Sequence, residues 1–343
     1  MPSITLKNSI RIGEGNPPYF VAELNSSHYG SVETAKQMID AAADCGCNCV
    51  KFQSWSSETL YSRTYFRANP IAERFVKKFS MSVDQLSELA EYCKNAGVDF
   101  SSTPYSREEV DFLADKIGAP FIKIASMELN NYPFLEYIAK KGTPIVLSTG
   151  MGTEEEVCRA VETIEKAGNH DICLLHCISN YPPEISEINL LNIVGLQEKF
   201  PNYPVGFSDH SSGTEMAAAA VALGACLIEK HLTLDKTKIG MDNQMATEPD
   251  EMKLMVQQCH NVRTALGSKE RTVLDAELEQ RKNMRRSLIY TRDMEAGEVI
   301  TEVDIDAKRP GTGFPPEDMP KYIGRTVTRH VERDTLIVRE DFE

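Results

Sequence analysis

The stretch "VGFSDHSSG", residues 205–213, places a serine, an aspartate and a histidine directly after an apolar run. Further along, "LIEKHLTL" (227–234) repeats the arrangement with Glu229 and His231. Both runs are rich in residues that favour strands, and side chains two positions apart on a strand point to the same face. The two segments therefore predict two strands that each end in a histidine.

Six further strand-like runs precede these two, at 19–24, 49–54, 98–104, 121–126, 144–150 and 172–179. Stretches with helical character alternate with the runs, at 31–46, 82–97, 107–118, 132–142, 153–168, 190–200, 213–224 and 249–267. Eight strand–helix pairs are typical of a closed parallel barrel, so the expected fold class is an α/β (β/α)8 TIM barrel. A doubly wound open sheet is the alternative, although no G-x-G-x-x-G motif follows the first run.

The two ends of the chain show other patterns. Residues 4–13, "ITLKNSIRIG", suggest a β-hairpin that caps the bottom of the barrel. We expect the barrel with this cap to occupy residues 1–270 and a charged linker to occupy 271–284. Residues 285–343 contain short β pieces with Gly and Pro turns, which predict a small β-rich domain.

Composition excludes several classes of function. The net charge of −14 makes nucleic acid and acidic membrane surfaces poor partners. No stretch approaches the run of about 18 apolar residues that a membrane span needs. The start of the chain has no apolar signal core, so we expect a cytoplasmic protein, and its nine cysteines are expected to be reduced and mostly buried.

Polar residues end every predicted strand, where an apolar core would not place them, and this end of a TIM barrel carries the chemistry. They are Glu23, Asn25, Lys51, Gln53, Ser101, Ser102, Thr103, Lys123, Ser126, Ser148, Thr149, His176, Ser179, Ser208, His210, Glu229 and His231. One buried lysine or histidine is usually structural, but polar endings on eight strands indicate a binding site. Two lysines with a ring of hydroxyls suit a phosphate or a phosphate–carboxylate ligand.

The histidines His210 and His231 indicate a metal site. Neighbouring strands lie about 5 Å apart, so both rings could reach one ion at about 2.1 Å. Two protein ligands leave positions open for water and substrate, which suits loosely held Mn²⁺ or Mg²⁺ better than structural zinc. We therefore expect a divalent metal ion as cofactor.

A series of longer motifs runs through the sequence in order: "AELNSSHYGSVETAKQMIDAA" (22–42), "VKFQ" (50–53), "SSTPYS" (101–106), "FIKIASMELNNYP" (121–133), "VLSTGM" (146–151), "SNYPP" (179–183), "GFSDHSSG" (206–213), "EKHLTLDK" (229–236) and "KRPG" (308–311). Over nearly the whole chain these motifs resemble the sialic acid synthase family. The resemblance implies a TIM barrel followed by an antifreeze-like (SAF) domain. It also implies a transferase that condenses phosphoenolpyruvate with an N-acetylated hexosamine and water, giving a nine-carbon 2-keto-3-deoxy sugar acid and phosphate.

The resemblance further implies roles for the residues that match. Catalytic roles fall to Glu23, Lys51, Lys123 and His231. The phosphoenolpyruvate-binding residues would be Lys51, Thr103, Lys123, Ser126, Ser148, Ser179 and Ser208. The sugar would contact Gln53, Tyr181, Glu229 and Asp242, and the metal would be held by His210 and His231. Arg309 would enter the site of a partner subunit, which implies a domain-swapped homodimer.

Two departures from the family pattern concern the sugar. Met241 and Asn243 in "GMDN" (240–243) stand where members often carry proline and histidine, and Ser179 stands where some carry asparagine. The sugar therefore stays open between N-acetylmannosamine and a diacetamido-trideoxyhexose. The alternative functions are a Schiff-base aldolase that uses Lys51 or Lys123, and a carbohydrate- or ice-binding protein.

Overall fold

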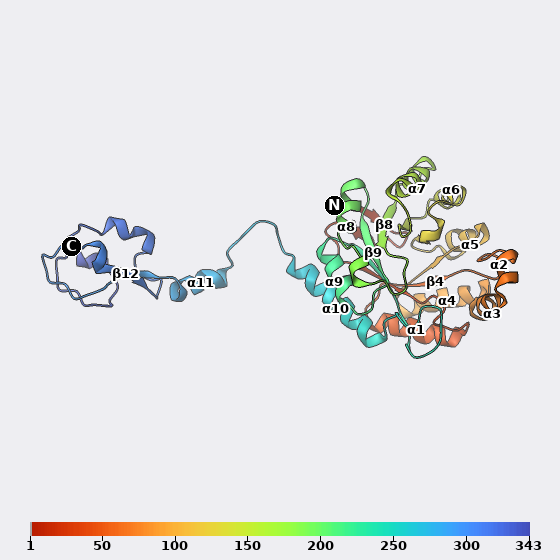
Figure 1. Ribbon diagram of the computed structural model, residues 1–343, viewed down its shortest axis with the longest axis horizontal. Coiled ribbons are helices and arrows are strands. Elements are labelled where there is room, and N and C mark those ends of the chain that lie inside the picture. Colours follow the sequence, from red (N-terminus) through yellow and green to blue (C-terminus); the bar gives the residue numbers. More distant parts are fainter. Residues whose placement is uncertain (1) are drawn as a thin grey trace. The chain divides into compact units, whose positions relative to one another are not determined.

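The computed structural model describes residues 2–343 of the chain. The chain divides into two compact units, Met1–Gly267 and Ser268–Glu343. In the first unit, helices surround a sheet of eight parallel strands (Figure 1). The strands are β3 (Tyr19–Glu23), β4 (Cys49–Gln53), β5 (Asp99–Thr103), β6 (Ile122–Ile124), β7 (Ile145–Ser148), β8 (Ile172–Cys177), β9 (Val205–Asp209) and β10 (Leu227–His231).

The strand order β5-β4-β3-β10-β9-β8-β7-β6 follows the chain around a ring, with β10 beside β3. The two ends of this order meet where the Ser101 hydroxyl donates to the carbonyl oxygen of Phe121 at 2.8 Å. The sheet is therefore a nearly closed barrel. The TIM-barrel prediction is confirmed, and the doubly wound sheet, whose strand order reverses at a switch point, is excluded.

The barrel helices match the predicted stretches. They are α1 (Val32–Asp44), α4 (Val83–Ala96), α5 (Arg107–Asp111) continued by the π-helix η1 (Phe112–Ile117), α6 (Tyr132–Ala139), α7 (Glu154–Lys166), α8 (Asn192–Lys199), α9 (Glu215–Ala222) and α10 (Pro249–Ala265). Two further helices, α2 (Arg63–Ala68) and α3 (Pro70–Phe79), follow β4 and were not anticipated. They are held by a small cluster of their own, in which Phe66 and Phe79 pack with Trp55.

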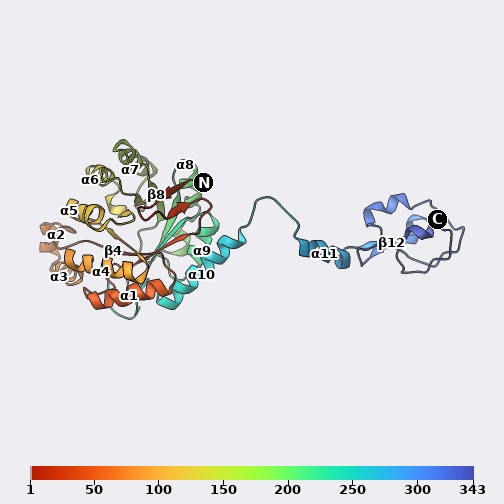
Figure 2. The ribbon, with the colours of Figure 1, turned by 180° about the vertical axis from the view of Figure 1, so that it is seen from behind.

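One end of the barrel is closed by the N-terminal hairpin of β1 (Ser3–Thr5) and β2 (Arg11–Gly13) (Figure 2, dark red near the N label). Its residues Ile4, Leu6 and Ile12 share an apolar cluster with residues at the beginnings of the barrel strands, such as Tyr19 and Phe121. Because this end is filled with apolar side chains, ligands can enter only at the carboxyl ends of the strands.

Inside the barrel, β9 and β10 approach so closely that only glycine fits at position 206. A Cβ atom there would lie 2.5 Å from the carbonyl oxygen of Leu227 and 2.7 Å from a methyl group of Leu175. Because glycine has no side chain, the two strands that carry the histidines can pack against each other while the side chain of Leu175 fills the space beside them.

A buried ion pair joins the same two strands on their opposite, helix-facing side. Asp209 and Lys230 are register partners, and their side chains are 0% and 1% exposed. The Lys230 ammonium donates to Asp209 Oδ2 and to the carbonyl oxygen of Ser211, both at 2.7 Å. Asp209 Oδ1 accepts from the Ser211 hydroxyl at 2.6 Å. The pair fixes the register of β9 against β10 and the turn that follows β9.

The second unit begins with α11 (Asp275–Met284), which lies within the predicted linker. Its sheet pairs β11 (Ser287–Tyr290) with β12 (Ile305–Lys308) in antiparallel fashion. A separate small core contains Leu288, Tyr290, Ile300, Val327 and Ile337. Within the described residues, none of the helices of either unit is both long and apolar enough to cross a bilayer.

Replacing Lys230 by methionine should strand the Asp209 carboxylate without its counter-charge, and we expect a loss of about 3–5 kcal/mol of unfolding free energy. Urea titration followed by the fluorescence of Trp55, the single tryptophan, reports on the barrel unit. The control is Lys77→Met, which removes an exposed pair with Glu73 and should change stability by less than about 0.5 kcal/mol. Equal effects of the two substitutions would contradict a structural role for the buried pair.

Candidate active site

A cavity of about 320 Å³ opens at the carboxyl ends of the barrel strands. It is lined by every barrel residue to which the family resemblance gave a role: Glu23, Lys51, Gln53, Thr103, Lys123, Ser126, Ser148, Ser179, Tyr181, Ser208, His210, Glu229, His231 and Asp242. These residues come together because the carboxyl ends of all eight strands meet at one face of the barrel. Arg309 belongs to the second unit.

Four of the polar residues at the strand ends do not line this cavity: Ser101, Ser102, Thr149 and His176. The ring of His176 stacks on Phe207, and its Nε2 lies 2.7 Å from the carbonyl oxygen of Ile188. His176 is thus a structural histidine on the helix-facing side of β8. Its neighbour Cys177 faces the cavity instead, and the alternation of side chains along a strand could have identified it.

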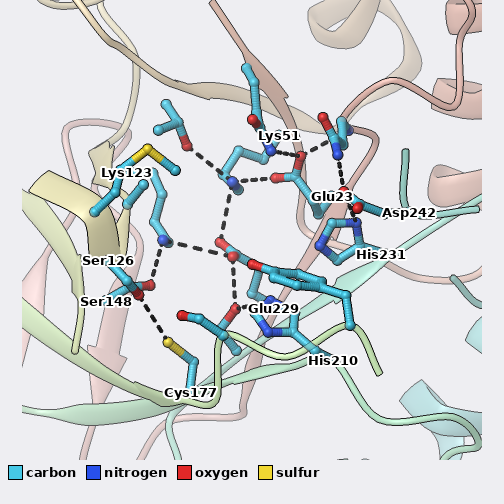
Figure 3. Close-up of a pocket in the computed structure, with 18 of the residues that line it drawn as sticks. Glu23, Lys51, Lys123, Ser126, Ser148, Cys177, His210, Glu229, His231 and Asp242 are labelled. Atoms are coloured by element: carbon cyan, nitrogen blue, oxygen red, sulfur yellow. Dashed lines mark hydrogen bonds and ion pairs between the residues drawn. The ribbon is translucent and has the colours of Figure 1, made fainter. Parts of the chain in front are cut away.

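The floor of the cavity is a network of buried charges centred on Glu229. Figure 3 shows the ammonium groups of Lys51 and Lys123 directed toward this carboxylate, at 3.7 and 3.8 Å. Lys51 also contacts the Glu23 carboxylate and donates to the Thr103 hydroxyl at 3.1 Å. Lys123 donates to the Ser148 hydroxyl at 2.6 Å. Both lysines thus share Glu229, and each has a hydroxyl beside it.

These contacts shift the pKa values in different directions. Burial opposes the ionisation of Glu229, but the charges of Lys123 and Lys51 outweigh it and lower the pKa of this carboxyl. Burial raises the pKa of Glu23, against the opposing charge of Lys51. Burial also opposes the charge of Lys51, but the carboxylates of Glu229 and Glu23 outweigh it and raise the pKa of this lysine. For Lys123 burial is the stronger influence, and it lowers the pKa. Glu229 and Lys51 are therefore held charged, while Glu23 binds a proton more readily than an exposed glutamate.

The Glu23 carboxylate is held in one orientation. Its Oε1 accepts from the backbone N–H of Asn25 at 2.8 Å and from the side-chain amide of Gln53 at 3.2 Å. The amide of Gln53 is itself oriented, because its oxygen accepts from Trp55 Nε1 at 3.1 Å and from the Tyr105 hydroxyl at 2.9 Å. Only the NH₂ group of Gln53 can then face Glu23.

The two predicted metal ligands lie together on the other side of the cavity, with ring centroids 5.5 Å apart. His210 Nδ1 lies 2.7 Å from the carbonyl oxygen of Ile178, so Nδ1 carries the proton and Nε2 keeps a free electron pair. Burial lowers the pKa of both histidines, which keeps the rings neutral as metal binding requires. Asp242 Oδ2 lies 3.9 Å from His231 Nδ1. The pair fits a divalent cation.

Further protein ligands are not in place beside these histidines. Within residues 2–343 there is no group of three or more His, Cys, Asp or Glu side chains arranged to hold a metal ion. A cation held by the two imidazoles would therefore keep several coordination positions for oxygen atoms of water or substrate.

The loop after β10 departs from the family pattern at Asn243, and the structure explains what this residue does. Its buried side chain accepts from the Ser27 hydroxyl at 2.8 Å and donates to the Tyr29 hydroxyl. The preceding residue, Asp242, accepts a hydrogen bond from the side-chain amide of Asn25. Asn243 thus ties this loop to the loop after β3 and holds Asp242 over the cavity.

Gly150 leaves room for three cavity residues on neighbouring strands. A Cβ atom on Gly150 would lie 2.5 Å from the Ser179 hydroxyl and 2.8 Å from both Ser126 Oγ and Cys177 Sγ. Any larger residue would displace the hydroxyls that line this wall of the cavity.

Sequence reasoning left several cavity residues without a role: Asn25, Trp55, Leu60, Tyr61, Tyr105, Ala125, Met127, Met151, Cys177 and Met241. Most of them lie on loops after the strands rather than within them. Loop residues lack the regular alternation that identifies the inward side of a strand, so the sequence carries no signal for them.

Comparisons with known proteins agree with this geometry. Residues 38–271 match the NeuB family, and residues 285–343 match the SAF domain. The chain is 34% identical to the N,N'-diacetyllegionaminic acid synthase of Legionella pneumophila, over 95% of this chain and 94% of that protein. It is also 34% identical to the human N-acetylneuraminate-9-phosphate synthase, over 96% and 94%.

A solved structure shows the same fold. The N-acetylneuraminic acid (sialic acid) synthetase of Leptospira borgpetersenii, crystallised in complex with citrate, is 35% identical and superimposes with a TM-score of 0.74, covering 81% of this chain and 94% of that one. The family match extends over most of the barrel, and the relatives match both units. The chain therefore belongs to the NeuB family, carries a SAF domain at its C-terminal end, and is an enzyme of the acid synthase type.

Proposed function

We propose that this enzyme condenses phosphoenolpyruvate with an N-acetylated hexosamine and water to give a nonulosonic acid and phosphate. The observation that carries the proposal is the division of one cavity into two sides. Lys51 and Lys123 lie on one side with hydroxyl groups beside them, and the neutral pair His210 and His231 lies on the other with Asp242. The first side suits a phosphate and a carboxylate, and the second suits a sugar aldehyde beside a cation.

Phosphoenolpyruvate binds on the lysine side. Lys51 and Lys123 neutralise its phosphate and carboxylate, and the hydroxyls of Thr103, Ser126, Ser148, Ser179 and Ser208 supply directed hydrogen bonds. Glu229 offsets the repulsion between the two ammonium groups before the ligand arrives, because both lie within 4 Å of its carboxylate. The anion therefore enters a site whose charges are already in place.

As carbon C3 of phosphoenolpyruvate forms a bond to the aldehyde carbon of the sugar, the C2–C3 and aldehyde C=O double bonds become single bonds. Positive charge develops at C2, and the aldehyde oxygen becomes an alkoxide that takes up a proton. Glu23, held by Asn25 and Gln53, takes a proton from the water that adds at C2. The bond between C2 and the bridging oxygen then breaks, phosphate leaves, and a 2-keto acid remains. Gln53, Tyr181, Glu229 and Asp242 bind the hydroxyl and N-acetyl groups of the sugar.

His210 and His231 would hold a divalent cation, Mn²⁺ or Mg²⁺, which would supply Lewis acidity at the aldehyde oxygen. We expect His231→Ala to weaken Mn²⁺ binding at least about 100-fold. Loss of a residue that only hydrogen-bonds to a metal ligand typically lowers metal affinity about 10–100-fold, and loss of the ligand itself should lower it more. Calorimetric titration of Mn²⁺ measures this directly. The control is His170→Ala, which alters an exposed histidine outside the cavity. Unchanged Mn²⁺ affinity in His231→Ala would remove the metal assignment.

A Schiff-base aldolase remains a second candidate, because burial lowers the pKa of Lys123 and so favours the neutral amine that such enzymes need. The two functions make opposite predictions. A synthase should release phosphate from phosphoenolpyruvate only with an acceptor sugar, should lose this activity in EDTA, and should give no adduct with pyruvate and borohydride. A borohydride-stable pyruvate adduct on Lys123 detected by mass spectrometry, together with EDTA resistance, would establish the aldolase.

The second unit contributes Arg309 to the partner's site in this proposal, as part of a domain-swapped homodimer. Arg309 is exposed, and within residues 2–343 it forms no ion pair with a carboxylate. Loops after β8 and β10 also expose apolar side chains, Ile185, Leu191 and Ile239, that a partner would cover. Both features support a site completed by a second copy.

Subunit mixing tests this arrangement. Arg309→Ala and Lys51→Ala should each abolish turnover, but equal mixtures unfolded and refolded together should regain about a quarter of the wild-type activity, because half the dimers are mixed and each has one complete site. Arg333→Ala, an exposed arginine of the same unit, is the control and should stay active. Mixtures that stay inactive would show that Arg309 does not act across subunits.

A further inference from the structure

The side-chain amide of Gln53 lies between Glu23 and two donors on neighbouring loops. Its NH₂ group donates to Glu23, and its oxygen accepts from Trp55 Nε1 and from the Tyr105 hydroxyl. An indole N–H can only donate, so a turned amide would set two donors against each other and would lose the bond to Glu23. The orientation of Gln53 therefore depends on where Trp55 and Tyr105 are held.

One carboxylate fixes both donors. Glu109 lies in the first turn of α5, and its Oε2 accepts from the backbone N–H of Tyr105 at 2.5 Å. Its Oε1 accepts from the Thr59 hydroxyl at 2.9 Å. Thr59 Oγ1 in turn accepts at 2.9 Å from the backbone N–H of Ser56, the residue that follows Trp55. Glu109 thus joins the loop after β5 to the loop after β4.

Glu109 reaches the site only through these neighbours. Of the described residues, those that line the cavity do not include Glu109. Burial raises the pKa of its carboxyl, while hydrogen bonds from Tyr105, Ser106 and Thr59 favour the charged form. Hydrogen bonds to a charged acceptor are shorter and stronger than those between neutral groups. The two loops are therefore tied by strong bonds at a point that the substrate does not touch.

The orientation of Gln53 matters because the two oxygens of Glu23 have different partners. Oε1 is held by the backbone N–H of Asn25 and by Gln53, whereas Oε2 contacts the Lys51 ammonium. Loss of the bond from Gln53 would leave Oε1 with one donor, and the carboxylate could then turn further toward Lys51. A base that is turned in this way no longer faces the water it has to deprotonate.

We infer that Tyr105 and Glu109 are positioning residues for Glu23, which they orient through Gln53 rather than by contact with the substrate. This inference rests on the proposed synthase function, in which Glu23 takes the proton of the attacking water. It extends that function to two loop residues to which the family resemblance gave no role.

The first test uses Tyr105→Phe, which removes the hydroxyl and keeps the ring. Phosphate release from phosphoenolpyruvate is measured with Mn²⁺ and the best acceptor among N-acetylmannosamine, N-acetylmannosamine 6-phosphate and 2,4-diacetamido-2,4,6-trideoxymannose. We expect kcat to fall about 10-fold and the KM for phosphoenolpyruvate to change by less than about 2-fold, because only the base is displaced. The control is Tyr137→Phe, which removes a hydroxyl that donates to Asp111 at 2.6 Å away from the cavity and should leave kcat unchanged.

A double-mutant cycle with Gln53→Ala tests the route. In the Gln53→Ala background, Tyr105→Phe should lower kcat by less than about a further 2-fold, because the amide through which the hydroxyl acts is gone. An equal loss of kcat in both backgrounds, or a rise in the KM for the sugar in place of a loss of kcat, would show that Tyr105 contacts the substrate itself. Either result overturns the inference.

Variants of Glu109 test the anchor. Glu109→Ala removes the acceptor for both loops and should lower kcat about 10-fold, as Tyr105→Phe does. Glu109→Gln keeps one acceptor oxygen, and its NH₂ group can donate to the Thr59 hydroxyl, so most of the activity should return. The matched control is Glu156→Ala, which removes the corresponding capping glutamate of α7. It should lower the urea midpoint to a similar extent and leave kcat unchanged.

The outcomes separate the inference from the function on which it rests. If the wild-type enzyme releases phosphate but Glu109→Ala loses no more kcat than Glu156→Ala, the synthase function stands and the inference is overturned. If the wild-type enzyme releases no phosphate with any of the three sugars, the synthase function fails and the inference fails with it.

Discussion

The site depends on one constraint, which is that two ammonium groups must stay buried inside a barrel without repelling each other. Glu229 meets this constraint by lying between Lys51 and Lys123, at 3.7 and 3.8 Å. Ser208 donates to Glu229 at 2.9 Å and holds the carboxylate in place. Without this carboxylate, burial would favour the neutral form of both lysines, and the cavity would lose its positive charge.

The strands that carry Glu229 and the histidines are stabilised from both sides. Gly206 lets β9 and β10 approach inside the barrel, and the Asp209–Lys230 pair joins them outside. Along each strand the direction of the side chain alternates, so Ser208 and Glu229 face the cavity while their neighbours Asp209 and Lys230 face the helices. Cavity-lining groups and structural charges thus occupy adjacent positions of the same strands.

Much of this architecture could be predicted from the sequence. The eight strands are apolar runs with a polar end, and every barrel residue to which the family resemblance gave a role lines one cavity. The prediction failed where direction mattered: His176 was placed with the site, but Cys177 is the residue that faces it. Helices α2 and α3 were missed because their apolar cluster around Trp55 forms only in three dimensions. The positions of Met127, Met151 and Met241 at the cavity could not be predicted either, because loop conformation decides which side chains face inward.

The loop held by Asn243 places some of the cavity residues on a segment separate from the barrel strands. Most of the groups that we propose to bind the three-carbon donor lie on strands or directly after them. Asp242, which we propose to bind the sugar, lies instead on a loop that Asn243 attaches through side-chain hydrogen bonds to Ser27 and Tyr29. A change of acceptor preference would therefore need the exchange of only a few loop residues, while the barrel strands stay unaltered. This loop is the segment to mutate first when the enzyme is to be redirected toward unnatural sugars.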